Sequence, residues 1–179
     1  CVLYPESALR APLETLRNAG PASALWPLGI SGDLPIVVLR IDEAEDIEIA
    51  RQILRAHSYW RAKLLAVDLV FINDRAASYA QDLQTALDTL VRVHAERMGT
   101  QGGNIYLLRS DLMNANAREK LLAAARVVLS NRRGTLAEQV ERVLDDKPVT
   151  PPRPRKLVAV KHHSARASLA QLENPNDFC

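Results

Sequence analysis

Six polar side chains stand near the ends of three apolar runs, and their chemical types suit a hydroxyl-rich ligand. They are Arg40, Asp42, Asn73, Asp74, Arg109 and Asp111. A carboxylate accepts two or more hydrogen bonds, whereas guanidinium and amide groups donate them. A rim that combines these groups offers both donors and acceptors to the hydroxyl groups of a sugar. We therefore treat these six residues as candidate ligand contacts.

The three apolar runs predict buried strands, and the sequence after each run predicts a helix. The strands are expected at 36–41, 67–72 and 105–108, and the first is apolar on both faces apart from Arg40. Alternation of strand and helix requires parallel pairing, so the polar ends of the strands meet at one edge, where open α/β sheets bind ligands. The predicted fold is α/β: a three-layer Rossmann-like or flavodoxin-like βαβαβα domain with a short parallel sheet.

Capping of helices is the alternative role for the aspartates at the strand ends, because aspartate is a favoured N-cap residue. Asp42, with Glu45 three residues later, resembles a capping box, so we expect Asp42 to begin the helix after the first strand. Thr135 and Glu138 form a second pattern of this kind. A third helix is expected over 116–130, which is rich in Leu and Ala. For Asp42 we favour the capping role over ligand contact.

The chain divides by composition into three parts. Residues 1–34 form a lead-in rich in Pro and Gly, residues 35–146 form the α/β domain, and residues 147–179 form a linker and tail with Pro and basic residues. Three strands are few for a self-standing parallel sheet. We expect a fourth strand from the lead-in, from 157–160, or from another copy of the chain. The last case makes self-association part of the fold.

Histidine, glycine and serine patterns give no motif for a metal, a cofactor or a nucleophile. His57 and His94 lie on expected helices, and His162 and His163 lack a carboxylate or cysteine partner at metal-ligand spacing. The glycines at 29–32 precede a strand, whereas a phosphate-binding loop lies between a strand and a helix. The serines have no nucleophile-elbow context. We therefore predict no catalytic residue, no metal and no cofactor.

Bulk composition excludes several classes of protein. The net charge of +2 is too small to argue for nucleic acid, and the chain has no run of about 20 apolar residues, so we predict no nucleic-acid partner and no insertion into a membrane. The basic stretch 147–166 is interpreted as a solvated linker, with binding to an anionic surface as the alternative. A chain that begins at Cys1 without Met and ends at Cys179 is interpreted as a fragment. The sequence leaves open whether Cys1 and Cys179 form a disulfide bond.

Several stretches of the chain resemble one known family. They read LWPLGISGDLPI at 25–36, RAHSYWR at 55–61, VDLVFIN at 67–73, and ARVVL at 125–129 followed by RGTLAEQ at 133–139. The family is that of the cyclic β-1,2-glucan synthases, which are very long bacterial inner-membrane proteins. The resemblance covers about residues 1–145, and the first of these stretches is its most specific part.

This resemblance implies a segment of the glycoside-phosphorylase-like half, between carbohydrate-binding sandwich domains. The catalytic carboxylates of the family are expected in another domain, so the segment would be a noncatalytic structural or carbohydrate-contact module of a glycosyltransferase. Its partners would be neighbouring domains of the same polypeptide and a β-glucan, and it would be soluble, on the cytoplasmic side of the membrane. The residues alone leave an alternative: a small α/β enzyme acting on a sugar or sugar phosphate at the same sheet edge.

Overall fold

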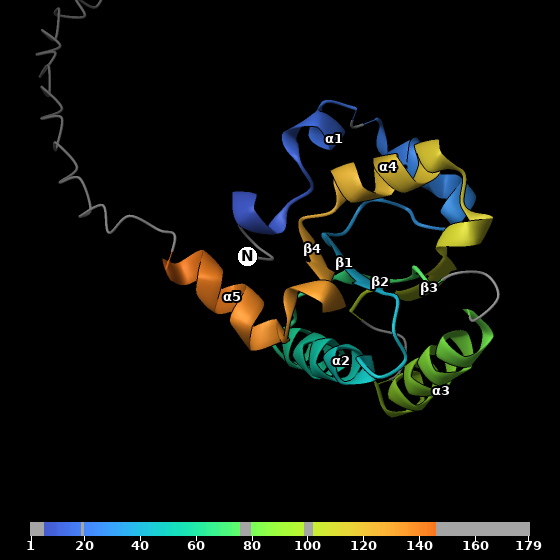
Figure 1. Ribbon diagram of the computed structural model, residues 1–179, viewed down its shortest axis with the longest axis vertical. Coiled ribbons are helices and arrows are strands. Elements are labelled where there is room, and N and C mark those ends of the chain that lie inside the picture. The colour runs from blue at the N-terminus through green and yellow to red at the C-terminus, as the bar shows by residue number, and fades with distance from the viewer. Residues whose placement is uncertain (1–5, 19, 76–79, 99–101, 146–179) are drawn as a thin grey trace, which may run out of the picture. The chain divides into compact units, whose positions relative to one another are not determined.

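Four parallel strands form the sheet at the centre of the computed structural model, in the order β3-β2-β1-β4 (Figure 1). The strands are β1 Ile36–Ile41, β2 Asp68–Asn73, β3 Ile105–Arg109 and β4 Val127–Ser130. β1 lies inside the sheet, where Val37 is in register with Leu69 of β2 and with Val127 of β4. Strands β1 and β2 are buried at nearly every position, as strands covered on both faces must be. The parallel sheet between helices confirms the predicted three-layer α/β fold.

The structure describes most of the first of two compact units into which the chain divides. The units are Cys1–Pro148 and Val149–Cys179, and the described residues are 6–18, 20–75, 80–98 and 102–145. The predicted linker and tail, the strand expected at 157–160 and both terminal cysteines therefore lie outside the described residues. Within the described ranges, no helix combines the length and the apolar character that a membrane crossing requires.

Helices cover both faces of the sheet, and each face has its own apolar core. The helices are α1 Leu13–Arg17, α2 Ile47–Ala62, α3 Ala80–Met98, α4 Ala115–Ala124 and α5 Leu136–Asp145, with short 3₁₀ helices η1 Ser7–Leu9, η2 Ala22–Leu28, η4 Ser110–Leu112 and η5 Asn131–Arg133. Helices α2 and α3 cover one face, where Ile53 and Leu39 share a core (Figure 1). Helix α4 and η2 cover the other, where Leu121 and Leu25 share a core with Val38.

The fourth strand corrects the prediction of one continuous helix over 116–130. Helix α4 ends at Ala124, and β4 begins at Val127, so only two residues separate helix from strand. Val127 and Val128 are β-branched and favour a strand, and pairing with β1 buries both of them. The Leu and Ala residues before them favour a helix, so the sequence does not show where the helix ends and the strand begins. The fourth strand of the sheet is thus the chain's own β4, which none of the three expected sources included.

Asp42 does not cap a helix, which corrects the capping-box prediction for it. Helix α2 begins only at Ile47, and its N-cap residue Asp46 makes no side-chain capping bond. Asp42 directly follows β1, and its carboxylate accepts hydrogen bonds from Asn131 and Arg132 instead. Arg132 carries a full positive charge and a backbone amide at a helix start does not, so the carboxylate is held by the turn after β4.

The second predicted capping box is confirmed at the start of α5. The amide of Glu138 donates to the hydroxyl of Thr135 over 3.3 Å, and the amide of Thr135 donates to Oε2 of Glu138 over 2.8 Å. This reciprocal pair satisfies two backbone donors at the helix start. The helix therefore begins at a fixed place behind the turn that follows β4.

Candidate functional site

The order of the strands creates a crevice at the carboxyl ends of β1 and β4. From β1 the chain moves to β2 and β3 on one side, and after α4 it returns to place β4 on the other side of β1. Helices α2 and α4 therefore cover opposite faces, and they diverge where the strand order reverses. Ligands of open α/β sheets bind in the crevice at such a switch point.

A polar pocket of about 250 Å³ occupies this crevice. Its walls come from the ends of β1 and β4, from the loop after β2, from α4 and from η4. The lining residues are Arg40, Asp42, Asp74, Ser110, Arg118, Ser130, Asn131 and Arg132. We call it the switch-point pocket. Residues from distant parts of the chain meet in it because the parallel sheet brings all strand ends to one edge.

Asp74 joins three segments of the chain within this pocket. Its Oδ2 accepts a hydrogen bond of 2.6 Å from Nε of Arg40 in β1, and its Oδ1 accepts one of 2.8 Å from Nη2 of Arg118 in α4. The carboxylate is 11% exposed, whereas the two arginine side chains are 38% and 34% exposed. Both oxygens of Asp74 are thus engaged, and the arginines keep one edge toward solvent.

Asp42 forms a second anchor on the other side of the pocket. Its Oδ1 accepts a hydrogen bond of 2.7 Å from Nδ2 of Asn131, and its Oδ2 accepts one from Arg132. Burial raises the pKa of Asp42, but the hydrogen bonds from Arg132 and Asn131 and the charge of Arg132 outweigh it, so the pKa of Asp42 is lowered. Hydrogen bonding to Asp42 in turn raises the pKa of Arg132, and the charges of Asp74 and Glu43 add to this.

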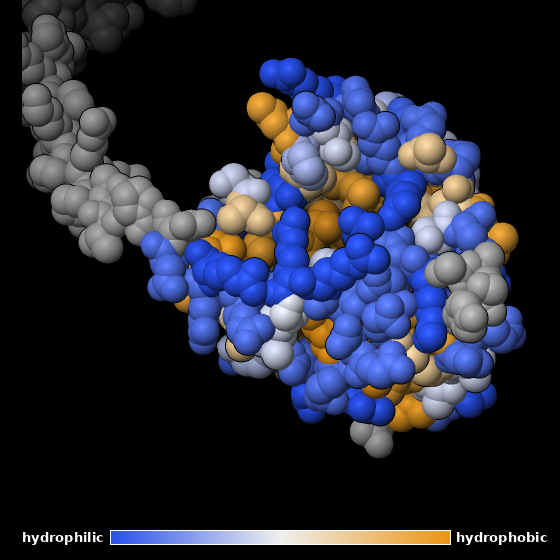
Figure 2. Space-filling model, in the orientation of Figure 1, coloured by the Kyte–Doolittle hydropathy of each residue, from blue (hydrophilic) through white to orange (hydrophobic). Residues whose placement is uncertain are grey.

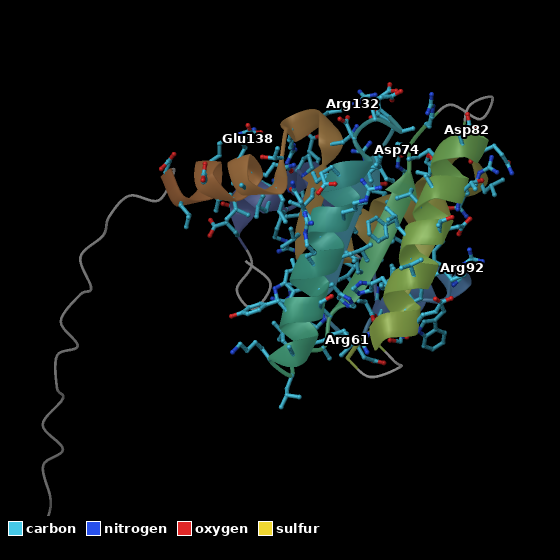
Figure 3. All side chains as sticks on the ribbon, turned by 90° about the horizontal axis from the view of Figure 1, so that it is seen from below. Arg61, Asp74, Asp82, Arg92, Arg132 and Glu138 are labelled. Carbon is cyan, nitrogen blue, oxygen red and sulfur yellow. The ribbon has the colours of Figure 1, made fainter. Side chains whose placement is uncertain are left out.

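Figure 3 shows Arg132 and Asp74 at the same end of the molecule, with Arg61 at the opposite end. The charge of Asp74 contributes to the raised pKa of Arg132, so the carboxylates of Asp42 and Asp74 both act on this arginine. Asn131 adds a bond of 2.8 Å from its Nδ2 to Oδ2 of Asp46, just before α2. The turn after β4 is therefore tied both to the end of β1 and to the start of α2.

Three of the six candidate contacts lie outside the lining of this pocket. Asn73 is buried at the end of β2, where its Nδ2 donates to Oε1 of Gln84 over 3.1 Å and its Oδ1 accepts from the amide of Arg75. Arg109 and Asp111 form a bidentate pair with distances of 3.1 Å and 2.6 Å, and the hydrogen bond from Arg109 lowers the pKa of Asp111. Asn73 therefore shapes the loop after β2, and the Arg109–Asp111 pair stands beside the pocket.

Five lining residues were not among the sequence candidates. They are Ser110, Arg118, Ser130, Asn131 and Arg132. Asn131 and Arg132 follow an apolar strand as the other candidates do, and reading 127–130 as a strand would have pointed to them. Arg118 lies within a helix, and its spacing carries no signal that it faces the strand ends.

The chemistry available in the switch-point pocket is hydrogen bonding and charge, not acid–base transfer by histidine. His57 bonds through Nε2 to the carbonyl oxygen of Val67 over 3.1 Å, next to the amino end of β2 and so at the opposite edge of the sheet. Among residues 6–18, 20–75, 80–98 and 102–145, no three His, Cys, Asp or Glu residues are grouped to hold a metal ion. What the pocket offers is a set of guanidinium, hydroxyl and amide donors around two carboxylates.

A second, apolar groove of about 190 Å³ lies over the outer strand β4. It is lined by Leu9, Val37, Ile53, Ala56, Trp60, Val127, Leu129, Leu136 and Val140. Figure 2 shows hydrophobic atoms on this side of the molecule, bordered by strongly hydrophilic ones. Leu9, Val37, Ile53, Val127 and Leu129 are buried, so the floor of this groove belongs to the core of the domain.

Fold and pocket together define a class: an α/β domain with an arginine-rich polar pocket at its switch point. No protein-family model matches the chain. The chain is 43% identical over 145 residues, or 79% of its length, to cyclic β-(1,2)-glucan synthase NdvB of Rhizobium meliloti (strain 1021). It thus belongs to the cyclic β-1,2-glucan synthase family, as the sequence predicted. The match spans 5% of the length of that relative.

Proposed function

We propose that this chain is a noncatalytic module of a cyclic β-1,2-glucan synthase-like protein, which positions neighbouring domains and contacts the glucan at the switch-point pocket. Family membership and the glucan synthase activity named for the relative support a role in carbohydrate chemistry. Because the match spans only 5% of that relative, the synthase activity would reside in other parts of the polypeptide. The proposal places the whole protein at the bacterial inner membrane, with this segment on the cytoplasmic side.

The pocket itself carries the proposal of glucan contact. Arginine, serine and asparagine donors lie beside the carboxylates of Asp42 and Asp74, at the edge where α/β sheets bind ligands. Sugar hydroxyls both donate and accept hydrogen bonds, so they can be matched by such a mixed rim. The volume of about 250 Å³ limits the contact to part of a sugar chain.

The way the carboxylates are held supports a noncatalytic role. Glycoside cleavage needs a carboxylic acid with a raised pKa that can protonate the leaving oxygen. The pKa of Asp42 is lowered, and both oxygens of Asp74 accept hydrogen bonds from arginines. The lowered pKa makes Asp42 a poor proton donor, and the bonds to both oxygens of Asp74 make that side chain an anchor for two arginines.

The apolar groove over β4 supports the positioning role. Its lining comes from η1, α2, α5 and the strands, so a neighbouring domain docked there would contact several elements at once. The occupant we propose is an adjacent domain of the same polypeptide, since the chain matches only a small part of its relative. Association between copies of this chain is the other outcome, and sedimentation of the isolated chain would reveal it.

Titration of the labelled chain with short linear β-1,2-linked glucan tests the glucan contact. We expect amide shifts in NMR spectra at Arg40, Asp42 and Ser130, and none at Asn104 at the opposite edge of the sheet. Replacement of Arg118 by Ala should remove these shifts, whereas Arg109→Ala, beside the pocket, should keep them. Unchanged spectra at saturating glucan would refute the glucan contact and leave the positioning role to be judged in the whole protein.

A second candidate function is a small enzyme acting on a sugar or sugar phosphate at the same edge. The observation that favours it is that Asp42 and Asp74 line one pocket, whereas helix capping would have kept them apart. Incubation of the chain with glucose 1-phosphate or β-1,2-linked glucan, followed by chromatography, tests it. Turnover that is lost in Asp42→Asn would establish the enzyme, and an unchanged sugar pool would remove it.

A further inference from the structure

The switch-point pocket contains more positive than negative charge. Among the residues that line it, three guanidinium groups face two carboxylates, which leaves one positive charge in excess; Glu43, whose charge also acts on Arg132, lies outside this lining. The three arginines come from β1, from α4 and from the turn after β4, and all three line the pocket. Convergence of like charges from separate segments costs free energy, and two carboxylates offset it only in part.

The hydrogen bonds in the pocket use its acceptors more completely than its donors. All four carboxylate oxygens of Asp42 and Asp74 accept a bond from Asn131 or an arginine. A guanidinium group carries five N–H donors. Within the described residues, Arg40 bonds only through Nε and Arg118 only through Nη2, so each keeps further donors for a ligand.

The exposure of the arginines makes these donors accessible. The side chain of Arg132 is 78% exposed, and those of Arg40 and Arg118 are about half as exposed. The hydroxyl groups of Ser110 and Ser130 line the same space and add two shorter donors. A ligand that fits this arrangement must be rich in acceptors and negatively charged.

We infer that the switch-point pocket binds a phosphoryl group, carried by a phosphorylated sugar or present as free inorganic phosphate. A phosphoryl group has several terminal oxygens in a tetrahedral arrangement, so it can accept hydrogen bonds from more than one of the three arginines that line the pocket. Guanidinium groups bind phosphate oxygens through paired N–H donors, which gives both charge and geometry. A carboxylate ligand has two coplanar oxygens and would use fewer of the three arginines.

This inference rests on the proposed function for the location of the ligand, and it adds the charge of that ligand. A neutral glucan uses donors and acceptors equally, whereas a phosphorylated one would place its phosphate on the arginines and its hydroxyls on Asp42, Asp74 and the serines. The anchored carboxylates then hold the arginines in place while the ligand supplies the missing negative charge.

Calorimetry and NMR titration of the whole 179-residue chain test the inference with four probes at equal ionic strength. The probes are inorganic phosphate, glucose 1-phosphate, the neutral β-1,2-linked glucose disaccharide and sodium chloride. We expect saturable shifts at Arg40, Ser130 and Asn131 with one or both phosphate probes and none with chloride. Affinity should fall as salt is added, because the contact is largely electrostatic.

Two matched variants locate the site. Arg118→Gln should weaken binding of the phosphate probe at least tenfold, and Arg109→Gln should leave it unchanged, since Arg109 pairs with Asp111 beside the pocket. If Arg118→Gln unfolds the chain, Ser110→Ala should still give a smaller loss, and the titration of the unaltered chain decides on its own.

The outcomes separate the inference from the proposed function. Binding of glucose 1-phosphate alone identifies a phosphorylated sugar, and binding of both phosphate probes identifies the phosphoryl group itself. Binding of the neutral disaccharide with no response to either phosphate probe overturns the inference and keeps the proposed glucan contact. No response to any probe overturns both the phosphoryl inference and the glucan contact. Binding that is lost in Arg109→Gln but kept in Arg118→Gln shows that the ligand does not bind in the switch-point pocket.

Discussion

Nη2 of Arg118 in α4 lies 2.8 Å from Oδ1 of Asp74, a residue 44 positions earlier in the sequence. The other oxygen of the same carboxylate accepts a bond from Arg40 in β1. One side chain at the end of β2 therefore ties the central strand to the helix that covers the opposite face from α2. This contact fixes the position of α4 relative to the strand ends and shapes one wall of the switch-point pocket.

Replacement of Asp74 by Asn should destabilise the chain by about 1–3 kcal/mol, the range for hydrogen bonds to charged groups. The neutral amide would leave Arg40 and Arg118 close together without a counter-charge, although their partial exposure moderates the cost. Urea unfolding followed by circular dichroism measures the effect. The matched control is Asp111→Asn on the same sheet edge, where the partly exposed carboxylate pairs with Arg109 alone and should contribute much less. Equal losses in the two variants would contradict a special role for Asp74.

The lowered pKa of Asp42 predicts a loss of stability in acid. Its folded-state pKa lies below its ordinary value of 3.8, so the unfolded chain takes up the proton first as the pH falls. The stabilising contribution is therefore complete above about pH 3.8 and is lost as the pH falls through the lowered value. Unfolding free energies measured between pH 5 and pH 2 should decrease less steeply in Asp42→Asn, and Asn131→Ala should lie between that variant and the unaltered chain. Parallel curves for all three would show that Asp42 is not held in this way.

Much of the site edge could be predicted from the sequence, because apolar runs that end in polar residues mark the carboxyl ends of parallel strands. Arg40, Asp42 and Asp74 were found by that pattern. Asn131 and Arg132 carry the same signal after 127–130, but the Leu and Ala residues before it favoured a helix, and β4 gains its stability from pairing with β1. Pairing between strands some 90 residues apart is invisible to local propensity.

The hydrogen-bond partners of the aspartates could not be predicted from neighbouring residues in the sequence either. A nearby Glu45 suggested a capping box for Asp42, yet the contacts that hold Asp42 come from residues 89 and 90 positions later. Charged donors brought close by the fold outcompete a local cap because their hydrogen bonds are stronger. Arg118 was missed for a related reason: helical spacing shows which residues share a face, but not which strand end that face meets.

His57 provides a second prediction of pH dependence, at the amino edge of the sheet. Burial lowers its pKa from an ordinary value of 6.5, and a carbonyl only accepts, so its Nε2 donates to Val67 as a neutral ring. The unfolded chain binds the proton first as the pH falls, so stability should decrease below about pH 6.5 until the lowered folded-state pKa is reached. NMR titration of the imidazole carbon protons should give a midpoint below 6.5 for His57. A midpoint at or above that value would contradict the prediction.

Gln139 does not line the switch-point pocket, but its side chain bonds to Ser130, which does, so replacing Gln139 should disturb the pocket. This buried side chain of α5 accepts a bond of 3.3 Å from the amide of Ser130 and donates from Nε2 to the carbonyl oxygens of Ser130, over 2.9 Å, and Gly134, over 2.8 Å. It thereby holds the end of β4 and the turn that carries Asn131. Gln139→Leu would remove these bonds at a net cost of about 0.5–1.5 kcal/mol for each, because Ser130 is half-buried and Gly134 is exposed, so water can reach them.

The pair of variants Gln139→Leu and Gln139→Glu separates packing from hydrogen bonding. Glutamate has nearly the same shape and can still accept from the amide of Ser130, but it cannot donate to the two carbonyl oxygens. Both variants should lower the urea midpoint by a similar amount, and both should broaden the amide signals of Ser130 and Asn131, because the turn loses two of its hydrogen bonds. A Gln139→Leu variant as stable as the unaltered chain, with sharp signals in this turn, would show that β4 ends there without help from α5.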